Sequence, residues 1–172
     1  MTTSSETTPV KKIQLEGKII AITGANRGIG LGIADSCLSN GASRVYSLDI
    51  GDPSEEFIAL SSQYPNQLFH ILADAKNEAS IQSATDEVLV QAGALHGMVC
   101  NAGRTKHKPA LDFTTEEIDQ LWGVNLYGSF YSARCAARAF IKQGVKGSIV
   151  FTASMASYGP NKVKLLLSYT ML

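Results

Sequence analysis

The sequence predicts an α/β fold built on a doubly wound parallel sheet. Short apolar runs that suit single strands alternate with segments of helical periodicity along the 172-residue chain. Because the expected strands are mostly apolar, both faces of the sheet should be covered by helices. A glycine-rich turn after the first strand is the third observation, since such a turn often joins a parallel strand to the helix that follows it.

Three strands are expected in the first half of the chain. They are apolar runs that each end at a turn: Lys18–Thr23, Arg44–Asp49 and Leu68–Leu72. Between the first two, Gly28–Asn40 carries apolar residues at helical spacing, so we expect a helix there. The segment Pro53–Gln63 fits either a loop or a helix.

Two strands and three helices are expected in the second half. The strands are Leu95–Cys100 and Gly147–Thr152. Apolar residues within Ala79–Gln91 recur with the spacing of an amphipathic helix. Thr114 is followed three residues later by Glu117, the pairing of a capping box, so a helix should begin there and run to Trp122. A longer helix is expected over Asn125–Gln143.

The composition suits one globular domain. Hydrophobic residues make up 45% of the chain and charged residues 17%, and the formal net charge is zero. A neutral chain argues against nucleic acid or an anionic membrane as the main partner. An apolar run of about 18 residues, as a membrane span requires, is absent from the sequence, so no membrane partner is expected.

Two features bear on location and metal binding. Cys37, Cys100 and Cys135 lack metal-ligand spacing, and each lies within or beside an apolar run. We therefore expect buried, reduced thiols, no metal site and a cytoplasmic location. Residues 1–14 lack the apolar core of a signal peptide, so a disordered tail is expected there.

The turn Thr23–Gly30 has the features of a phosphate-binding corner in a Rossmann-type sheet. Gly24 allows a tight turn, and Gly28 lets a pyrophosphate approach the backbone without a Cβ in the way. Gly30 allows the helix to pack closely on its strand. The first turn of that helix then offers free N–H groups and partial positive charge to an anion.

Polar residues stand at the carboxyl ends of the expected strands. Asp49 ends the second strand, Asp74 follows the third, Asn101 follows the fourth and Ser154 follows the fifth. In open parallel sheets, ligands bind beyond these ends, where the strand order reverses. The sequence therefore predicts a ligand site at this edge, with Asp49 placed to meet ribose hydroxyls.

Several motifs together resemble the short-chain dehydrogenase/reductase family. Thr23–Gly30 matches the family's T-G-x-x-x-G-x-G turn, and Asn101–Gly103 matches its N-A-G. Asn125 matches the helical Asn that holds a water for the family's proton relay. Gly147–Ser154 matches the strand that leads to the family's catalytic Ser. The resemblance covers about Leu15–Asn161.

The resemblance implies an NAD(P)-dependent oxidoreductase that interconverts an alcohol and its carbonyl compound. Phe151–Met155 is similar to members that act on sugars and polyols, such as fungal arabinitol, mannitol, sorbose or xylulose oxidoreductases. The family implies a small-molecule substrate and a homo-oligomer. It also assigns catalytic roles to Ser154 and Asn125. The residues that it assigns to the coenzyme are Thr23, Gly24, Asn26, Arg27, Gly28, Ile29, Gly30, Asp49, Asp74, Ala75, Asn101, Ala102 and Gly103.

The family's catalytic Tyr acts as general acid or base, and a Lys four residues later lowers its pKa. Tyr158 and Lys162 have this spacing, but the Gly and Pro between them forbid the helix that the pair needs. Tyr169 lies at a better distance from Ser154, but its Lys would stand directly after Leu172.

We therefore expect a C-terminally truncated member of the family. Residues 15–162 should form an incomplete domain that lacks the C-terminal strands, followed by a divergent tail over 163–172. Such a chain should be impaired as an oxidoreductase and is a doubtful oligomer. The alternative is a non-catalytic nucleotide-binding fragment, or an interaction partner of a full-length copy.

Two residues disagree about the coenzyme. The Asp49 carboxylate would accept hydrogen bonds from both hydroxyls of the adenosine ribose and would repel a 2′-phosphate, which favours NAD. Arg27, a basic residue inside the glycine turn, resembles members that prefer NADP. The repulsion between the Asp49 carboxylate and a 2′-phosphate should outweigh the attraction of that phosphate to the more distant Arg27. NAD is therefore expected, and NADP is the alternative.

Overall fold

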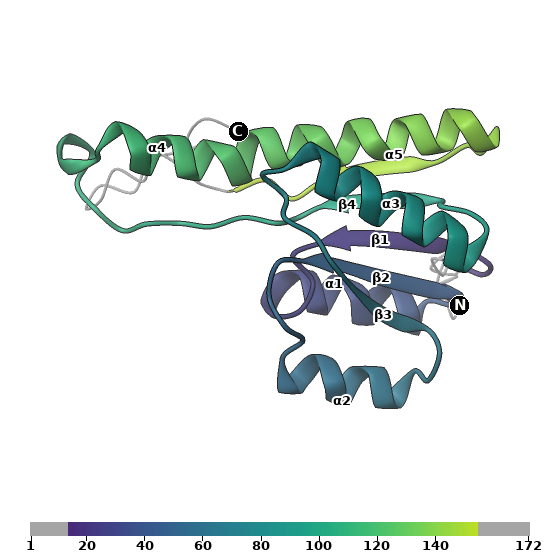
Figure 1. Ribbon diagram of the computed structural model, residues 1–172. Coiled ribbons are helices and arrows are strands. Elements are labelled where there is room, and N and C mark those ends of the chain that lie inside the picture. Colours follow the sequence, from purple (N-terminus) through teal and green to yellow (C-terminus); the bar gives the residue numbers. More distant parts are fainter. Residues whose placement is uncertain (1–13, 155–172) are drawn as a thin grey trace, which may run out of the picture.

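A computed structural model describes residues 14–154 of the protein, and its centre is a parallel sheet of five strands (Figure 1). The order across the sheet is β3-β2-β1-β4-β5, so the order reverses between β1 and β4. The strands are β1 (Ile19–Thr23), β2 (Arg44–Asp49), β3 (Leu68–Leu72), β4 (Gly97–Cys100) and β5 (Ser148–Phe151). This confirms the predicted doubly wound parallel sheet.

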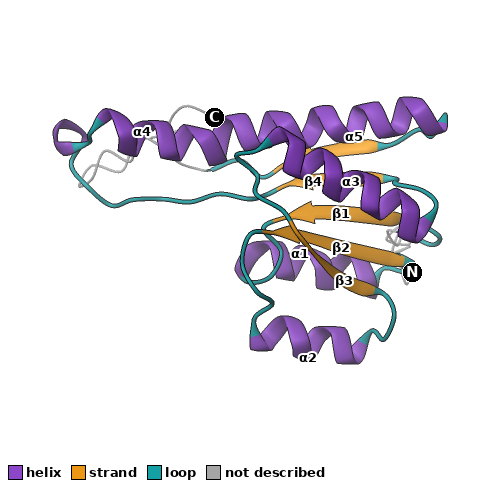
Figure 2. Cartoon of the chain, in the orientation of Figure 1, coloured by secondary structure: helices purple, strands orange, loops and turns teal. Residues whose placement is uncertain are grey.

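Helices cover both faces of the sheet (Figure 2). The helices are α1 (Gly28–Ser39), α2 (Glu55–Gln63), α3 (Glu78–Ala92), α4 (Thr115–Trp122) and α5 (Ser129–Gln143), with a short 3-10 turn, η1 (Ala110–Asp112), before α4. Alternate residues of β1 point to opposite faces of the sheet and belong to two hydrophobic cores. Ile20 and Ile22 pack with α1 and α2, while Ile19 and Ala21 pack with α3 and α5. The apolar strands thus reflect burial on both sides.

The segment that fitted either a loop or a helix forms α2. Ser54 caps this helix by accepting a hydrogen bond from the Phe57 N–H (3.2 Å). Phe57 and Leu60 are buried against the sheet. The cap and one apolar stripe are therefore enough to form a helix of nine residues here.

The expected break between two helices near Asn125 is wrong. A π-helical turn, η2 (Gly123–Gly128), joins α4 directly to α5, so one helical rod extends from Thr115 to Gln143 (Figure 1). Gly123 has ordinary right-handed helical angles (φ −52°, ψ −43°) and does not end the helix. A Cβ on Gly128 would lie 3.0 Å from the Ala75 carbonyl oxygen, so the rod packs tightly on the loop after β3.

The remaining expectations concern cysteines and the chain ends. Cys100 and Cys135 are buried free thiols, as predicted, whereas Cys37 is only half-buried. Desolvation raises the pKa of Cys100 to about 12, so its thiol stays protonated.

Within residues 14–154, no helix is both long and apolar enough to cross a bilayer. The expected tails and the motif residues Tyr158, Lys162 and Tyr169 lie outside the described residues.

His96 joins β1 to β4 at the start of both strands. Its Nδ1 accepts a hydrogen bond from the Ile19 N–H (3.1 Å), which only an unprotonated Nδ1 does. Burial lowers the pKa of His96 below its ordinary value of 6.5, and the positive charge of Lys18 lowers it further. The folded chain therefore binds this proton less readily than the unfolded chain.

This contact predicts a pH-dependent contribution to stability. The contribution should be complete above about pH 6.5 and should be lost as the pH falls toward the lowered native pKa, because the unfolded chain takes up the proton first. Urea unfolding between pH 7.5 and 5 should show a larger loss for the wild type than for His96→Leu. Equal losses in the two proteins would contradict this role for His96.

Candidate functional site

The glycine turn is confined by its own backbone and by the loop after β4. A Cβ on Gly24 would lie 2.9 Å from the Ala102 Cα, and one on Gly30 would lie 2.3 Å from the Gly24 carbonyl oxygen. Gly24 and Gly28 also have positive φ angles (+69° and +60°). A Cβ on Gly28 would meet no atom within 4 Å, so the space over this residue is open. The turn therefore requires glycine and leaves an approach to its backbone.

Thr23 and Asn101 join this turn to the loop after β4. The Asn101 Nδ2 donates hydrogen bonds to the carbonyl oxygens of Thr23 (3.0 Å) and Gly24 (3.1 Å). In return, the buried Thr23 Oγ1 accepts from the N–H groups of Asn101 and Ala102, both at 3.0 Å. These bonds connect the strands between which the sheet order reverses.

The N-terminus of α1 differs from those of three other helices. Side chains of Ser54, Asn77 and Thr114 cap α2, α3 and α4. Within the described part of the chain, no side chain caps α1, whose N-cap residue Arg27 is extended, and its first turn holds no acidic residue. The N–H groups at this end are therefore available to an external anion.

Asp49 lies beside this turn at the end of β2. Its Oδ2 accepts a hydrogen bond from the Asn26 N–H (3.1 Å), and its Oδ1 accepts one from the Gly51 N–H (3.1 Å). The Asn26 side chain is buried and donates to the Gly51 carbonyl oxygen (2.6 Å). Asn26 is a predicted coenzyme residue, but its side-chain amide points into the protein.

Sequence reasoning missed Ser47, which completes this group. The Ser47 hydroxyl is fully buried and donates a hydrogen bond to the Asn26 Oδ1 (2.8 Å). Ser47 stands two residues before Asp49 on β2, so both side chains lie on the same face of the strand. A polar residue between the apolar Tyr46 and Leu48, in the register of Asp49, is the signal that would have found it.

Asp74 and Ala75 form the turn between β3 and α3. The Asp74 Oδ1 accepts a hydrogen bond from the Lys76 N–H (2.9 Å), and the Asp74 N–H donates to the Ser80 hydroxyl (3.0 Å). Ala75 is buried beneath Gly128 of the helical rod. Both residues therefore occupy the carboxyl edge of the sheet, as their positions in the sequence predict.

Asn125 fixes the start of the loop that leads from β4 to α4. Its Oδ1 accepts a hydrogen bond from the Arg104 N–H (2.9 Å), and its Nδ2 donates to the Arg104 carbonyl oxygen (3.0 Å). The side chain is buried in η2. Because its amide is engaged by the backbone of Arg104, the part of Asn125 in a proton relay stays a prediction.

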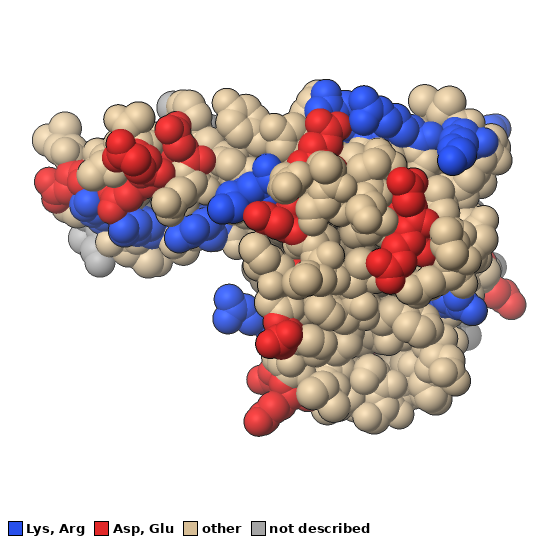
Figure 3. All heavy atoms as spheres, in the orientation of Figure 1, with Lys and Arg blue, Asp and Glu red and all other residues tan. Residues whose placement is uncertain are grey.

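Glu117 holds the next part of this loop. Its carboxylate accepts hydrogen bonds from Lys106 Nζ (2.5 Å) and Lys108 Nζ (2.8 Å), and also from the Thr114 N–H (3.1 Å) in the predicted capping box. These donors hold the pKa of Glu117 at about 2. Lys and Arg side chains gather along this loop beside the acidic residues of α4 (Figure 3). The capping pattern predicted Glu117 as a cap but not as a partner of two lysines.

Ser154 follows β5 at the same edge of the sheet and is half-buried. The two residues at the end of β5, Val150 and Phe151, are more than half exposed. Of the three predicted catalytic residues, Ser154 and Asn125 lie within the described part of the chain, and Tyr169 lies outside it. Within the described range, no group of three or more His, Cys, Asp or Glu side chains is arranged to hold a metal.

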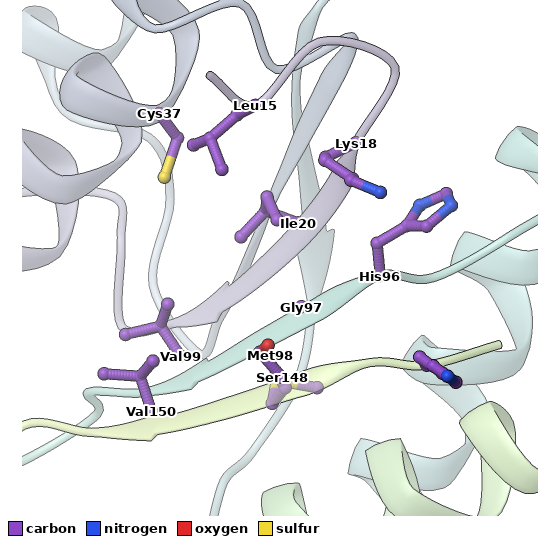
Figure 4. A pocket seen from close by; sticks show the side chains of 11 residues that line it. Leu15, Lys18, Ile20, Cys37, His96, Gly97, Met98, Val99, Ser148 and Val150 are labelled. Carbon is purple, nitrogen blue, oxygen red and sulfur yellow. The ribbon is translucent and has the colours of Figure 1, made fainter. Parts of the chain in front are cut away.

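A separate apolar pocket of about 260 Å³ lies on the α1 side of the sheet (Figure 4). Ile20, Val99 and Val150 line its floor, and the half-buried Cys37 lines its wall. Its lining includes no residue of the turn from Thr23 to Gly30. The pocket is therefore distinct from the carboxyl edge where the predicted site residues gather.

The chain is similar in sequence and in fold to known proteins. A family model described as short chain dehydrogenase matches residues 18–170. L-2,3-butanediol dehydrogenase from Corynebacterium glutamicum is 32% identical over 143 residues, covering 81% of this chain and 55% of that protein. Sorbitol dehydrogenase from Cereibacter sphaeroides is 33% identical over 144 residues, covering 84% of this chain and 55% of that protein.

A solved structure shows the same fold. The NADPH-dependent 3-quinuclidinone reductase from Rhodotorula rubra superposes with a TM-score of 0.81 at 26% identity, covering 98% of this chain and 64% of that one. The chain spans about half the length of the two curated relatives. On the family match and the shared fold, the chain belongs to the short chain dehydrogenase family.

Proposed function

We propose that the protein is an NAD-dependent oxidoreductase that interconverts a polyol or sugar alcohol with its carbonyl compound. The observation that carries this proposal is the N-terminus of α1, which no side chain caps within the described residues and into which the glycine turn leads. The Asp49 carboxylate lies beside this turn. A pyrophosphate fits the free N–H groups, and a ribose diol fits the carboxylate. The pyrophosphate would thus meet partial positive charge, and the neutral diol would meet a hydrogen-bond acceptor.

The choice of NAD rests on Asp49. The family uses NAD or NADP, and one structural relative is NADPH-dependent by name. A 2′-phosphate near Asp49 would place two anions together, whereas a ribose diol would donate hydrogen bonds to the same carboxylate. Arg27 is exposed at the N-cap of α1, and its positive charge is the feature of this chain that favours NADP.

The substrate class rests on the relatives and on the strand before Ser154. Two relatives act, by name, on a diol and on a polyol. The sequence Phe151–Met155 resembles polyol and sugar oxidoreductases of the fungal type. We therefore extend the proposal to a polyhydroxylated substrate.

The residues of this chain would bind, orient and support the chemistry. The bound nicotinamide would supply or accept the hydride. The glycine turn and Asp49 would hold the dinucleotide, while the bonds from Asn101 keep the turn in place. The Ser154 hydroxyl would donate a hydrogen bond to the substrate oxygen on which negative charge develops during reduction.

The coenzyme proposal predicts the behaviour of Asp49→Asn. NADH affinity should fall by about tenfold, because a charge-assisted hydrogen-bond acceptor is lost. NADPH affinity should rise or stay constant, because the repulsion of the 2′-phosphate is removed. Fluorescence titrations with both dinucleotides measure this, with Asp35→Asn, an exposed acid on α1, as the control for charge. Equal weakening for the two dinucleotides would contradict the proposal.

The oxidoreductase proposal predicts the behaviour of Ser154→Ala. With NAD and sorbitol or 2,3-butanediol, kcat/KM should fall by about 10²- to 10³-fold, because one donor to the developing oxyanion is lost. Ser62→Ala, an exposed serine on α2, serves as the control. NADH binding by the wild type without turnover of any alcohol would instead favour a non-catalytic nucleotide-binding role.

A further inference from the structure

We propose that Ser47, through Asn26, is a positioning residue that sets the preference of this site for an unphosphorylated ribose. The inference rests on the proposed function, because it concerns how Asp49 would meet the coenzyme. It adds a buried residue that does not touch the ligand. Ser47 would act by fixing the carboxylate that the ribose meets.

The Asp49 carboxylate is held at both oxygens. Oδ2 accepts from the Asn26 N–H and Oδ1 accepts from the Gly51 N–H, each at 3.1 Å. A carboxylate has about four acceptor positions, so each oxygen keeps one position for a ligand. Two acceptor positions on one rigid group match the two hydroxyls of a vicinal diol. The backbone bonds therefore decide where the diol binds.

The Asn26 side chain fixes the two backbone segments that supply these bonds. Its Nδ2 donates to the Gly51 carbonyl oxygen at 2.6 Å, which joins the glycine turn to the turn after β2. Only 3% of the Asn26 surface is exposed. The amide therefore serves the protein rather than the ligand, and its orientation controls the spacing of the two N–H donors.

Ser47 fixes the orientation of that amide. Its hydroxyl donates to the Asn26 Oδ1 at 2.8 Å, and Ser47 has no exposed surface. A reversed amide would place Oδ1 against the Gly51 carbonyl oxygen, where two acceptors repel. Without the Ser47 hydroxyl, the buried Oδ1 loses this donor, and the bond that holds Gly51 weakens.

The consequence is a change in selectivity rather than a general loss of binding. A displaced carboxylate would lose its bonds to the ribose diol, which weakens NADH. The same displacement would reduce the repulsion of a 2′-phosphate, which offsets the loss for NADPH. General damage to the glycine turn would instead weaken both dinucleotides equally, because they share the pyrophosphate.

The test compares three variants by the ratio of NADPH to NADH dissociation constants, measured by fluorescence titration. Ser47→Ala removes the hydroxyl, and Ser47→Thr keeps it. Ser132→Ala is the matched control, because Ser132 is also fully buried and donates one hydrogen bond, to the Gly128 carbonyl oxygen (2.7 Å) within the helical rod. Thermal unfolding of each protein checks that the fold persists.

Ser47→Ala should lower the ratio by about tenfold, mainly through weaker NADH binding, while Ser47→Thr and Ser132→Ala keep the wild-type ratio. An unchanged ratio in Ser47→Ala, with NADH still favoured by the wild type, would overturn this inference alone. If Ser47→Ala does not fold, a lowered ratio in Asn26→Ala supports the inference, and an unchanged one overturns it. A wild type that binds neither dinucleotide would overturn the proposed function and this inference with it.

Discussion

The rest of the site depends on the joint between β1 and β4. Asn101 donates to two carbonyl groups of the glycine turn, and the Thr23 hydroxyl accepts two N–H groups from the loop after β4. The sheet order reverses at this point, and open parallel sheets bind their ligands at such a reversal. These four hydrogen bonds fix the loops after β1 and β4 against each other.

Two further groups of contacts extend from this joint in opposite directions. Toward β2, the group formed by Ser47, Asn26 and Asp49 fixes a carboxylate beside the turn. Toward α4, Asn125 holds Arg104, and Glu117 holds the lysines farther along the loop. In each direction, a buried or shared polar side chain fixes a backbone segment. Loops that carry binding residues thus gain the rigidity of the strands.

Much of the fold followed from local patterns. Gly24 and Gly30 stand at positions where the structure leaves no room for a Cβ, and the spacing of the turn had indicated this close approach. The alternation of apolar runs and amphipathic segments was enough to predict the parallel sheet. The helix at Thr114 was recognised from its capping box, which the structure contains.

Other features depend on contacts between residues distant in sequence. The π turn around Asn125 joins two expected helices. The Asn125 side chain forms a hydrogen bond with the backbone of Arg104, 21 positions away. Ser47 and Asn26 are likewise 21 positions apart. Neither periodicity nor a short motif predicts such pairs, because the two residues of each pair meet only in the folded chain. Sequence reasoning therefore found the edge of the site and, through the family resemblance, Asn26, Asn101 and Asn125. It found neither Ser47 nor the hydrogen bonds that these side chains form.

The most direct test of the central claim is an ¹⁵N–¹H NMR titration of the chain with ADP-ribose, which carries the pyrophosphate and adenosine ribose without nicotinamide. We expect the amide signals of the turn between Thr23 and Gly30, and the amide signal of Gly51, to shift progressively until the site is saturated. Signals around the apolar pocket near Val150 should stay in place. Shifts confined to that pocket, or none at millimolar ligand, would contradict a dinucleotide site at the carboxyl edge.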